Sequence, residues 1–551
     1  ARDVASARND PQRLKLLGAA GEVLDRAAKD QSVETRHAAA IASLLVDDSN
    51  HAIDALRRIA SNDARVWSDL SAAYYANGRA ADAPNALAAA DRALEIDANL
   101  AEARFNRALV LERMGLLAEA RKAWEAYLQL DSTSAWATEA RAHLARLGTS
   151  ESSFRRDLSR SPLNALVANY PQESRTWGEG PFLAEWAEGR AESLARARAI
   201  GDLLAKRSNE TLLRDAVAAI DRARDTRPLI EGHLAYREGR MAYSRRELTQ
   251  AREKLQHAAE ALARGGSPMA LAARYFAANV VYDMNRPEEA FAELTRILEE
   301  TPPGHRALRA QILWQRALCS STLAHWSNAL ADAESAHAIF ESLGERSNRA
   351  FMDVIIAEML EYAEDSESAW HRRASAFETF SRGGDTERLI ACLGAATRGE
   401  VRRGNDAAAR SLAAIEIEAA RQGSNPGLLA VALFYRALLL HRSGEGDPMR
   451  DLTEARALAP RSGDAQRVLA EVDFAEGVVT RAKDQRRAIE LLSRSAEFFR
   501  QSFPVYLPAA LLERGRAYRD IGRLDDAAAD FNAGVDAIER KRASQSASEL
   551  E

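Results

Sequence analysis

The chain has 551 residues, of which 28% are charged, and its formal net charge is −6. Basic and acidic residues are interspersed, so the sequence lacks the clustered positive charge of a nucleic-acid-binding surface. The longest apolar run, residues 428–440, contains Arg436 and is shorter than the roughly 18 residues of a membrane-spanning helix. The two cysteines, Cys319 and Cys392, indicate a reducing compartment, and we expect a cytoplasmic protein.

Residues 1–147 contain imperfect copies of one pattern, in which a small residue is followed twelve positions later by alanine. Ala40 and Ala52 show this spacing, and so do Ala108 and Ala120. Alanine, leucine, arginine and glutamate dominate the whole chain, which favours helices. We therefore predict an N-terminal segment of degenerate helix pairs.

Residues 148–210 interrupt the pattern. Three prolines and two glycines between positions 162 and 181 exclude one long helix here. Trp177, Phe182 and Trp186 indicate a packed segment rather than a free linker. We predict an irregular helical junction between two repeat segments.

Residues 211–542 carry the pattern most regularly, with successive copies 39 or 40 residues apart. A period sustained over this length indicates a repeat array. We predict one main array here and a polar tail at residues 543–551. The pairs are Gly239/Ala251, Ala278/Ala290, Ala317/Ala329, Ala357/Ala369, Ala396/Ala408 and Gly515/Ala527.

The last copy, residues 511–542, shows the arrangement most clearly. Tyr518 follows Gly515 by three positions, Phe531 follows Ala527 by four, and Gly522 ends the first helix as a C′ glycine does. This pattern resembles the tetratricopeptide repeat, in its longer form from large bacterial regulators. The resemblance implies an all-α, right-handed superhelical solenoid, here with two repeat segments joined by the helical junction.

The order of the parts adds a second resemblance. Degenerate repeats, a Trp- and Pro-containing junction and repeats of about forty residues resemble the N-terminal region of bacterial proteins that couple tetratricopeptide repeats to a C-terminal CHAT domain, a caspase-like peptidase. The catalytic His and Cys of that family lie in the domain after the repeats, and neither motif is present here. The resemblance implies a sensing or autoinhibitory array whose effector, the CHAT domain, is a partner.

The last predicted helix, residues 525–542, carries apolar residues that no later helix covers. Phe531, Val535 and Ile538 would leave apolar surface exposed at the end of the array, where repeat proteins need a polar cap. We expect a downstream domain to pack there. The alternative is that the polar tail folds back or that the helix end frays.

The sequence offers no catalytic, cofactor or metal site. It contains no glycine-rich phosphate loop, no HExxH and no CxxC motif. Cys319 and His325 are six positions apart and so lie on different helix faces, which argues against a nucleophile–base pair. We therefore expect that the chain is not an enzyme.

Three functions remain open at this point. The first is a scaffold that binds a protein or peptide partner, because stacked helical repeats form extended concave surfaces. The second is the regulatory region of a protease, and the third is the sensor arm of a transcriptional or signalling regulator. Fold alone does not choose among them.

The resemblance also places a candidate partner-binding face on the first helix of each pair. Positions five, nine and twelve of the repeat look into the concave groove, and positions five and twelve share a helix face because they are two turns apart. The groove then changes from aromatic to acidic along its length, so one end would grip a peptide and the other would favour basic residues. The alternative is that the rings turn inward and fill the core. The candidate residues are Tyr236, Arg240, Tyr243, Tyr275, Asn279, Tyr282, Trp314, Ser321, Glu358, Glu361 and Glu400.

Overall fold

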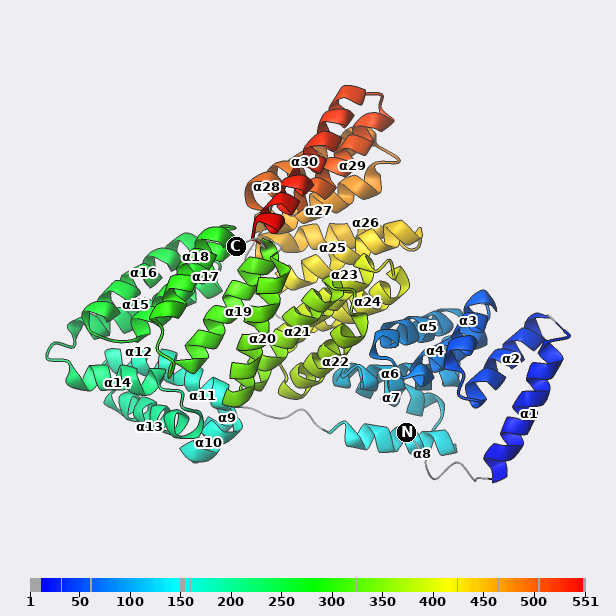
Figure 1. Ribbon diagram of the computed structural model, residues 1–551, viewed down its shortest axis with the longest axis horizontal. Coiled ribbons are helices and arrows are strands. Elements are labelled where there is room, and N and C mark those ends of the chain that lie inside the picture. Colours follow the sequence, from blue (N-terminus) through cyan, green and yellow to red (C-terminus); the bar gives the residue numbers. More distant parts are fainter. Residues whose placement is uncertain are drawn as a thin grey trace. The chain divides into compact units, whose positions relative to one another are not determined.

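The computed structural model describes residues 11–30, 32–59, 62–148, 154–158, 160–323, 325–423, 425–462, 465–503 and 506–548. Within these ranges the chain is helical and forms no strand, and successive helices pack against one another as pairs (Figure 1). The predicted all-α fold of packed helix pairs is confirmed within these ranges.

The helices fall into two compact units, and the division lies inside α21 (Arg346–Tyr362). The first unit, residues 1–151 and 360–419, contains α1 (Pro11–Ala27), α2 (Val33–Leu45), α3 (Ser49–Ile59), α4 (Ala64–Asn77), η2 (Ala80–Asp82), α5 (Ala83–Ile96), α6 (Ala101–Arg113), α7 (Leu117–Leu130), α8 (Ala135–Arg146), α22 (Ser366–Gly383), α23 (Thr386–Arg402) and most of α24 (Asp406–Gln422).

The second unit covers residues 152–359 and 420–551. Its helices are α9 (Phe154–Leu158), α10 (Leu163–Asn169), α11 (Pro171–Trp177), the π-helical turn η3 (Gly178–Phe182), α12 (Leu183–Ala187), α13 (Ala191–Ser208), α14 (Leu212–Arg222), α15 (Arg227–Ser244), α16 (Leu248–Arg264), α17 (Met269–Asp283), α18 (Pro287–Glu300), α19 (Arg306–Thr322), α20 (Trp326–Leu343), α25 (Pro426–Ser443), α26 (Pro448–Leu458), η4 (Ala459–Arg461), α27 (Ala465–Thr480), α28 (Gln485–Ser502), α29 (Leu507–Asp520) and α30 (Leu524–Ser548).

The turn within each pair follows the predicted geometry. Gly522, after α29, has a φ of +79°, and the N–H of Arg523 donates to the carbonyl of Tyr518 at 2.9 Å. Arg246 and Asn285 stand at the same place in their repeats and have φ values of +61° and +59°. The tight turn therefore imposes a left-handed residue even where the sequence has no glycine.

The small residue of each pair marks the closest approach of its two helices. A Cβ on Gly515 would lie 2.5 Å from the ring of Phe531, and one on Gly239 would lie 2.7 Å from the side chain of Leu255. The residue that fills the space is thus the one four positions after the repeat alanine, since Phe531 follows Ala527 by four and Leu255 follows Ala251 by four.

Residues 360–419 pack with the N-terminal repeats, although the sequence assigns them to the main array. The carboxylate of Glu367 accepts the N–H groups of Ala80 and Ala81, at 2.8 and 3.0 Å. A Cβ on Gly115 would lie 2.6 Å from the carbonyl oxygen of Ala374. These contacts join residues about 260 to 290 positions apart, and no repeat spacing predicts them.

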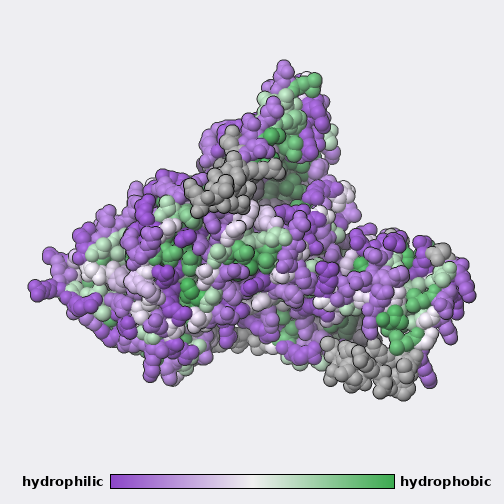
Figure 2. Space-filling model, in the orientation of Figure 1, coloured by the Kyte–Doolittle hydropathy of each residue, from purple (hydrophilic) through white to green (hydrophobic). Residues whose placement is uncertain are grey.

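The last helix, α30, extends through Ser548 and so includes part of the predicted polar tail; residues 549–551 lie outside the described ranges. Val535 and Ile538 are exposed, as expected, and so is Leu524. Figure 2 shows hydrophobic surface over the helices α27–α30. No helix in the described ranges is long and apolar enough to cross a membrane.

Overpacking the repeat alanines tests the register of the array. Ala290 and Ala329 are both completely buried. We expect Ala290→Trp and Ala329→Trp each to lower the free energy of unfolding by about 1–3 kcal/mol, because a ring has no space there. Chemical denaturation measures the change.

The matched control is Glu288→Trp, an equally bulky change at an exposed position of α18. It should alter the free energy of unfolding by no more than about 0.5 kcal/mol. Unchanged stability of both alanine variants would contradict the assigned register.

Candidate functional site

The aromatic part of the predicted face is more buried than the sequence indicates. Tyr236 and Tyr275 are only 3% and 5% exposed, and Asn279 is 5% exposed. Both tyrosines belong to the main hydrophobic core of the second unit. Trp314 is half-buried and packs against Phe351, with ring centroids 5.0 Å apart. The open aromatic face that the prediction requires is therefore absent at the two tyrosines.

The cover over these residues comes from the predicted junction. Phe182 and Leu183 lie in the same core cluster as Tyr236, and Trp186 stands edge-on to His233 of α15, with ring centroids 6.0 Å apart. Figure 1 shows α12 beside α15, which it contacts. The junction is thus a set of short helices packed across the first-helix face rather than a spacer.

A buried cluster of charges fixes one end of this cover. The Arg175 guanidinium donates to both carboxylate oxygens of Glu345, at 2.6 and 3.1 Å, and to Glu179 at 2.9 Å. Asn348 adds a hydrogen bond to Glu345 at 2.6 Å. All four residues are buried. The bond from Arg175 to Glu345 spans 170 positions and ties α11 to the start of α21.

This cluster holds more acid than base. Burial raises the pKa of Glu179, and the negative charge of Glu345 adds to that effect. Burial also raises the pKa of Glu210 to about 7, although its carboxylate accepts the N–H groups of Leu212 and Ala307, at 2.9 and 2.6 Å. Two carboxyl groups, those of Glu345 and Glu179, therefore pair with one buried guanidinium, and the carboxyl group of Glu210 lies near them.

The remaining predicted residues of α15 and α17 contact residues of the following repeat. Tyr243 donates to Asp283 at 2.8 Å, and Tyr282 lies 3.0 Å from the hydroxyl of Thr322. Each pair is 40 positions apart, so the twelfth-position tyrosine ties its repeat to the next one. Arg240 is half-buried and lies over the ring of Phe276, 3.7 Å from its centroid.

Ser321 and Glu358 are half-buried on α19 and α21. The other predicted acids belong to the first unit, and both are engaged with the chain's own groups. Glu361 pairs with the buried Arg373 and, at 2.9 Å, with Arg402. Glu400 is fully buried and accepts from Trp370 Nε1 at 2.9 Å. These carboxylates are thus already paired within the chain.

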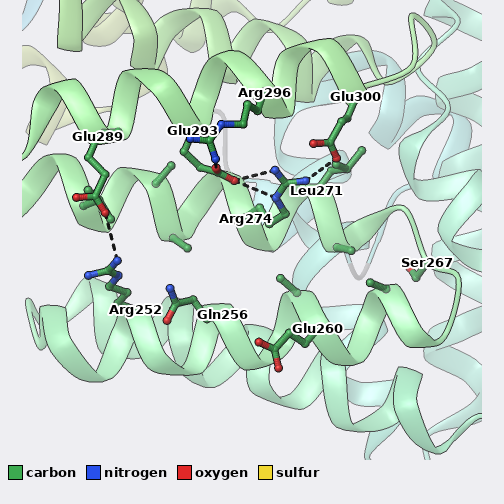
Figure 3. Close-up of a pocket in the computed structure, with 17 residues that line it drawn as sticks. Arg252, Gln256, Glu260, Ser267, Leu271, Arg274, Glu289, Glu293, Arg296 and Glu300 are labelled. Atoms are coloured by element: carbon green, nitrogen blue, oxygen red, sulfur yellow. Dashed lines mark hydrogen bonds and ion pairs between the residues drawn. The ribbon is translucent and has the colours of Figure 1, made fainter.

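An open groove lies elsewhere in the second unit, between the second helices α16 and α18, with α17 as its floor (Figure 3). Its volume is about 840 Å³. Small side chains dominate the floor and the lower walls, and Leu271 and Val281 are the larger apolar groups. Among the small lining residues, Ala263 is exposed, Ala270 and Ala277 are half-buried, and Ala259, Ser267, Ala278 and Ala290 are buried beneath them.

Charged residues form the rim of this groove. Arg252 of α16 reaches across to Glu289 of α18 at 3.3 Å and bridges one end. Arg274, on the floor, is held by Glu293 at 2.7 Å and by Glu300 at 2.5 Å (Figure 3). Glu260 has no ion pair in the part of the chain that the structure describes.

The sequence analysis missed this groove because it considered only positions five, nine and twelve of each first helix. A signal is present in α17, where Ala270, Arg274 and Ala277 recur at helical spacing among residues that the repeat pattern does not require. Alanines on an outward face of a helix give a surface that another chain can approach closely.

The cysteines lack the environment of a nucleophile. Cys319 and Cys392 are both buried. Burial raises the pKa of the Cys319 thiol to about 12, which keeps it protonated at neutral pH.

The sequence matches no protein-family profile and no curated protein. Solved structures of similar fold include yeast Tom70, with 15% identity over 89% of this chain and 96% of that chain (TM-score 0.37). A Rap protein complexed with competence and sporulation factor has 11% identity over 81% and 99% (TM-score 0.40). The apo quorum sensor NprR from B. thuringiensis has 13% identity over 65% and 98% (TM-score 0.44).

Neutralising Glu361 tests whether the acidic positions are structural. Arg373 is fully buried, and its Nε and Nη2 atoms have no hydrogen-bond partner among the described residues. Glu361→Gln leaves this guanidinium without its buried counter-charge, so we expect a loss of about 3–5 kcal/mol in the free energy of unfolding. Urea denaturation measures it.

Glu364→Gln, at an exposed position three residues further on, is the control and should change stability by no more than about 0.5 kcal/mol. Combining Glu361→Gln with Arg373→Met should recover part of the loss, because an apolar chain needs no counter-charge. Equal stabilities of Glu361→Gln and Glu364→Gln would contradict the structural role.

Proposed function

We propose that the chain is a protein-binding repeat scaffold, which holds a peptide or a short helical segment of a partner in the groove between α16 and α18. The observation that carries the proposal is the alanine-lined floor of α17, open to solvent and flanked by two helices. A helix laid in such a groove buries its apolar face against the floor and leaves its polar face in water.

The lining defines the segment that fits. Ala270, Leu271 and Ala277 would receive small or branched apolar side chains, since alanine floors permit close approach. Glu260 at the rim forms no ion pair with any described residue and would take a lysine or arginine from the partner. Arg252 and Arg274 are already paired, so acidic residues of a partner gain less there.

We also propose that the first-helix residues predicted from the sequence have a part in partner binding. Arg240 and Trp314 are half-buried and can contact a partner directly, whereas Tyr236 and Tyr275 become accessible only if the covering segment moves.

We propose, more specifically, that the chain is the regulatory region of a bacterial, cytoplasmic protein. The effector of that protein would be a CHAT peptidase domain. The order of repeats and junction supports it, and the exposed Leu524, Val535 and Ile538 on α30 offer apolar surface for a neighbouring domain. Sequencing the coding region beyond residue 551 tests it. A caspase-like domain is expected there, and a DNA-binding module would instead favour the sensor arm of a transcriptional regulator.

The groove is tested with a displayed library of random 16-residue peptides selected on the full chain. Ala277→Trp fills the floor of the groove, and we expect the selected peptides to bind this variant at least tenfold more weakly than the unchanged chain. Fluorescence anisotropy measures the binding, and circular dichroism checks that helicity and melting are preserved.

Ala195→Trp is the matched control, because Ala195 is an exposed helical alanine of α13 outside the groove. It should bind the selected peptides as the unchanged chain does. Peptides that bind Ala277→Trp with full affinity would show that the groove is not the site.

A further inference from the structure

The segment that covers the first-helix face has the contacts of a bound ligand. Its arginine is held by both oxygens of one carboxylate, that of Glu345, in the fork geometry with which proteins recognise a charged partner. Its apolar residues Phe182 and Leu183 are buried in the same core cluster as Tyr236 of α15. A peptide that is bound by a protein surface is commonly held in the same way, by one basic residue and by apolar residues close to it.

The fit between segment and face is incomplete. Within the described part of the chain, Glu179 Oε1 and Ser174 Oγ of the segment are buried without a hydrogen-bond partner, and so are His233 Nε2 of α15 and Asn279 Oδ1 of α17. Arg175 also pairs with two carboxyl groups, Glu345 and Glu179, so the acidic groups outnumber the one arginine that pairs with them. A face built only to hold this segment would satisfy these groups, and the face therefore has capacity for a more basic occupant.

The segment is also weakly built as a local structure. It consists of a seven-residue helix, a five-residue π-helical turn that includes Pro181, and a five-residue helix. Helices this short are unstable without tertiary packing, and π-helical turns are rare and are frequent at functional sites. The helices α15–α20 beneath it have 14 to 18 residues and pack in pairs, so the segment can open while they remain folded.

We propose that the face formed by α15, α17 and the start of α21 is a docking surface for a short helical segment of a partner protein that carries an arginine beside aromatic residues, and that residues 171–187 occupy it as an internal ligand. The partner's arginine replaces Arg175 on Glu345, so the buried ion pair is exchanged and not lost. This surface is separate from the groove between α16 and α18, and either can fail alone.

The test uses the full chain and a fluorescent peptide of residues 170–188. Arg175→Ala removes the internal anchor, and we expect the peptide to bind this variant at least tenfold more tightly than the unchanged chain. Adding Glu345→Gln to Arg175→Ala should abolish the gain, and a peptide carrying Arg175→Ala should not bind. Arg190→Ala, an exposed arginine just beyond the segment, should bind the peptide as weakly as the unchanged chain.

A folded Arg175→Ala chain that does not bind the peptide, or that binds both peptides equally, would overturn the proposal. Hydrogen exchange on the unchanged chain decides the matter if that variant does not fold. Amides of residues 172–187 should then exchange at least tenfold faster than the buried amides of α15 and α17. If the amides of the segment exchange only when those of α15 and α17 do, the segment is a permanent part of the core. That result would also refute the proposal.

Discussion

The close approach of two helices at one small residue is the constraint on which the repeat array depends. Where that residue is glycine, as at Gly239, Gly477 and Gly515, an added Cβ would lie within 2.7 Å of a side chain of the paired helix. Recurrence of this contact about every 39 residues puts equivalent residues at the same place in each repeat. Tyr243 and Tyr282 therefore occupy equivalent places, and each can reach the following repeat.

Buried charges determine which surfaces remain available to a partner. Glu361, Glu400 and Glu345 are each paired with groups of the same chain. Buried ion pairs contribute little net stability, but removing one partner is costly, so they favour one arrangement over others. The polar residues that the repeat pattern places on the first-helix face therefore form ion pairs and hydrogen bonds within the chain. The groove between α16 and α18 remains open because its alanines form no such bonds.

The sequence predicted the helix pairs, their register and the turn at Gly522 because these depend on contacts within about 20 positions. It predicted that the twelfth-position tyrosines share a face, but not that Tyr236 and Tyr275 are covered. The cover depends on Arg175 meeting Glu345, and no spacing rule relates residues 170 positions apart. The packing of residues 360–419 on the N-terminal repeats escaped prediction for the same reason.

The two proposed surfaces share one helix, α17. α17 presents Ala270 and Ala277 to the open groove and Tyr275 and Asn279 to the covered face. The groove can bind a partner without rearrangement. The covered face can bind one only in those molecules in which residues 171–187 have opened, so the apparent affinity of that face for its partner is reduced by the fraction of open molecules. A partner in the groove that shifts or tightens α17 changes that fraction through the packing of Tyr275. By linkage, an occupant of the face changes the affinity of the groove by the same factor.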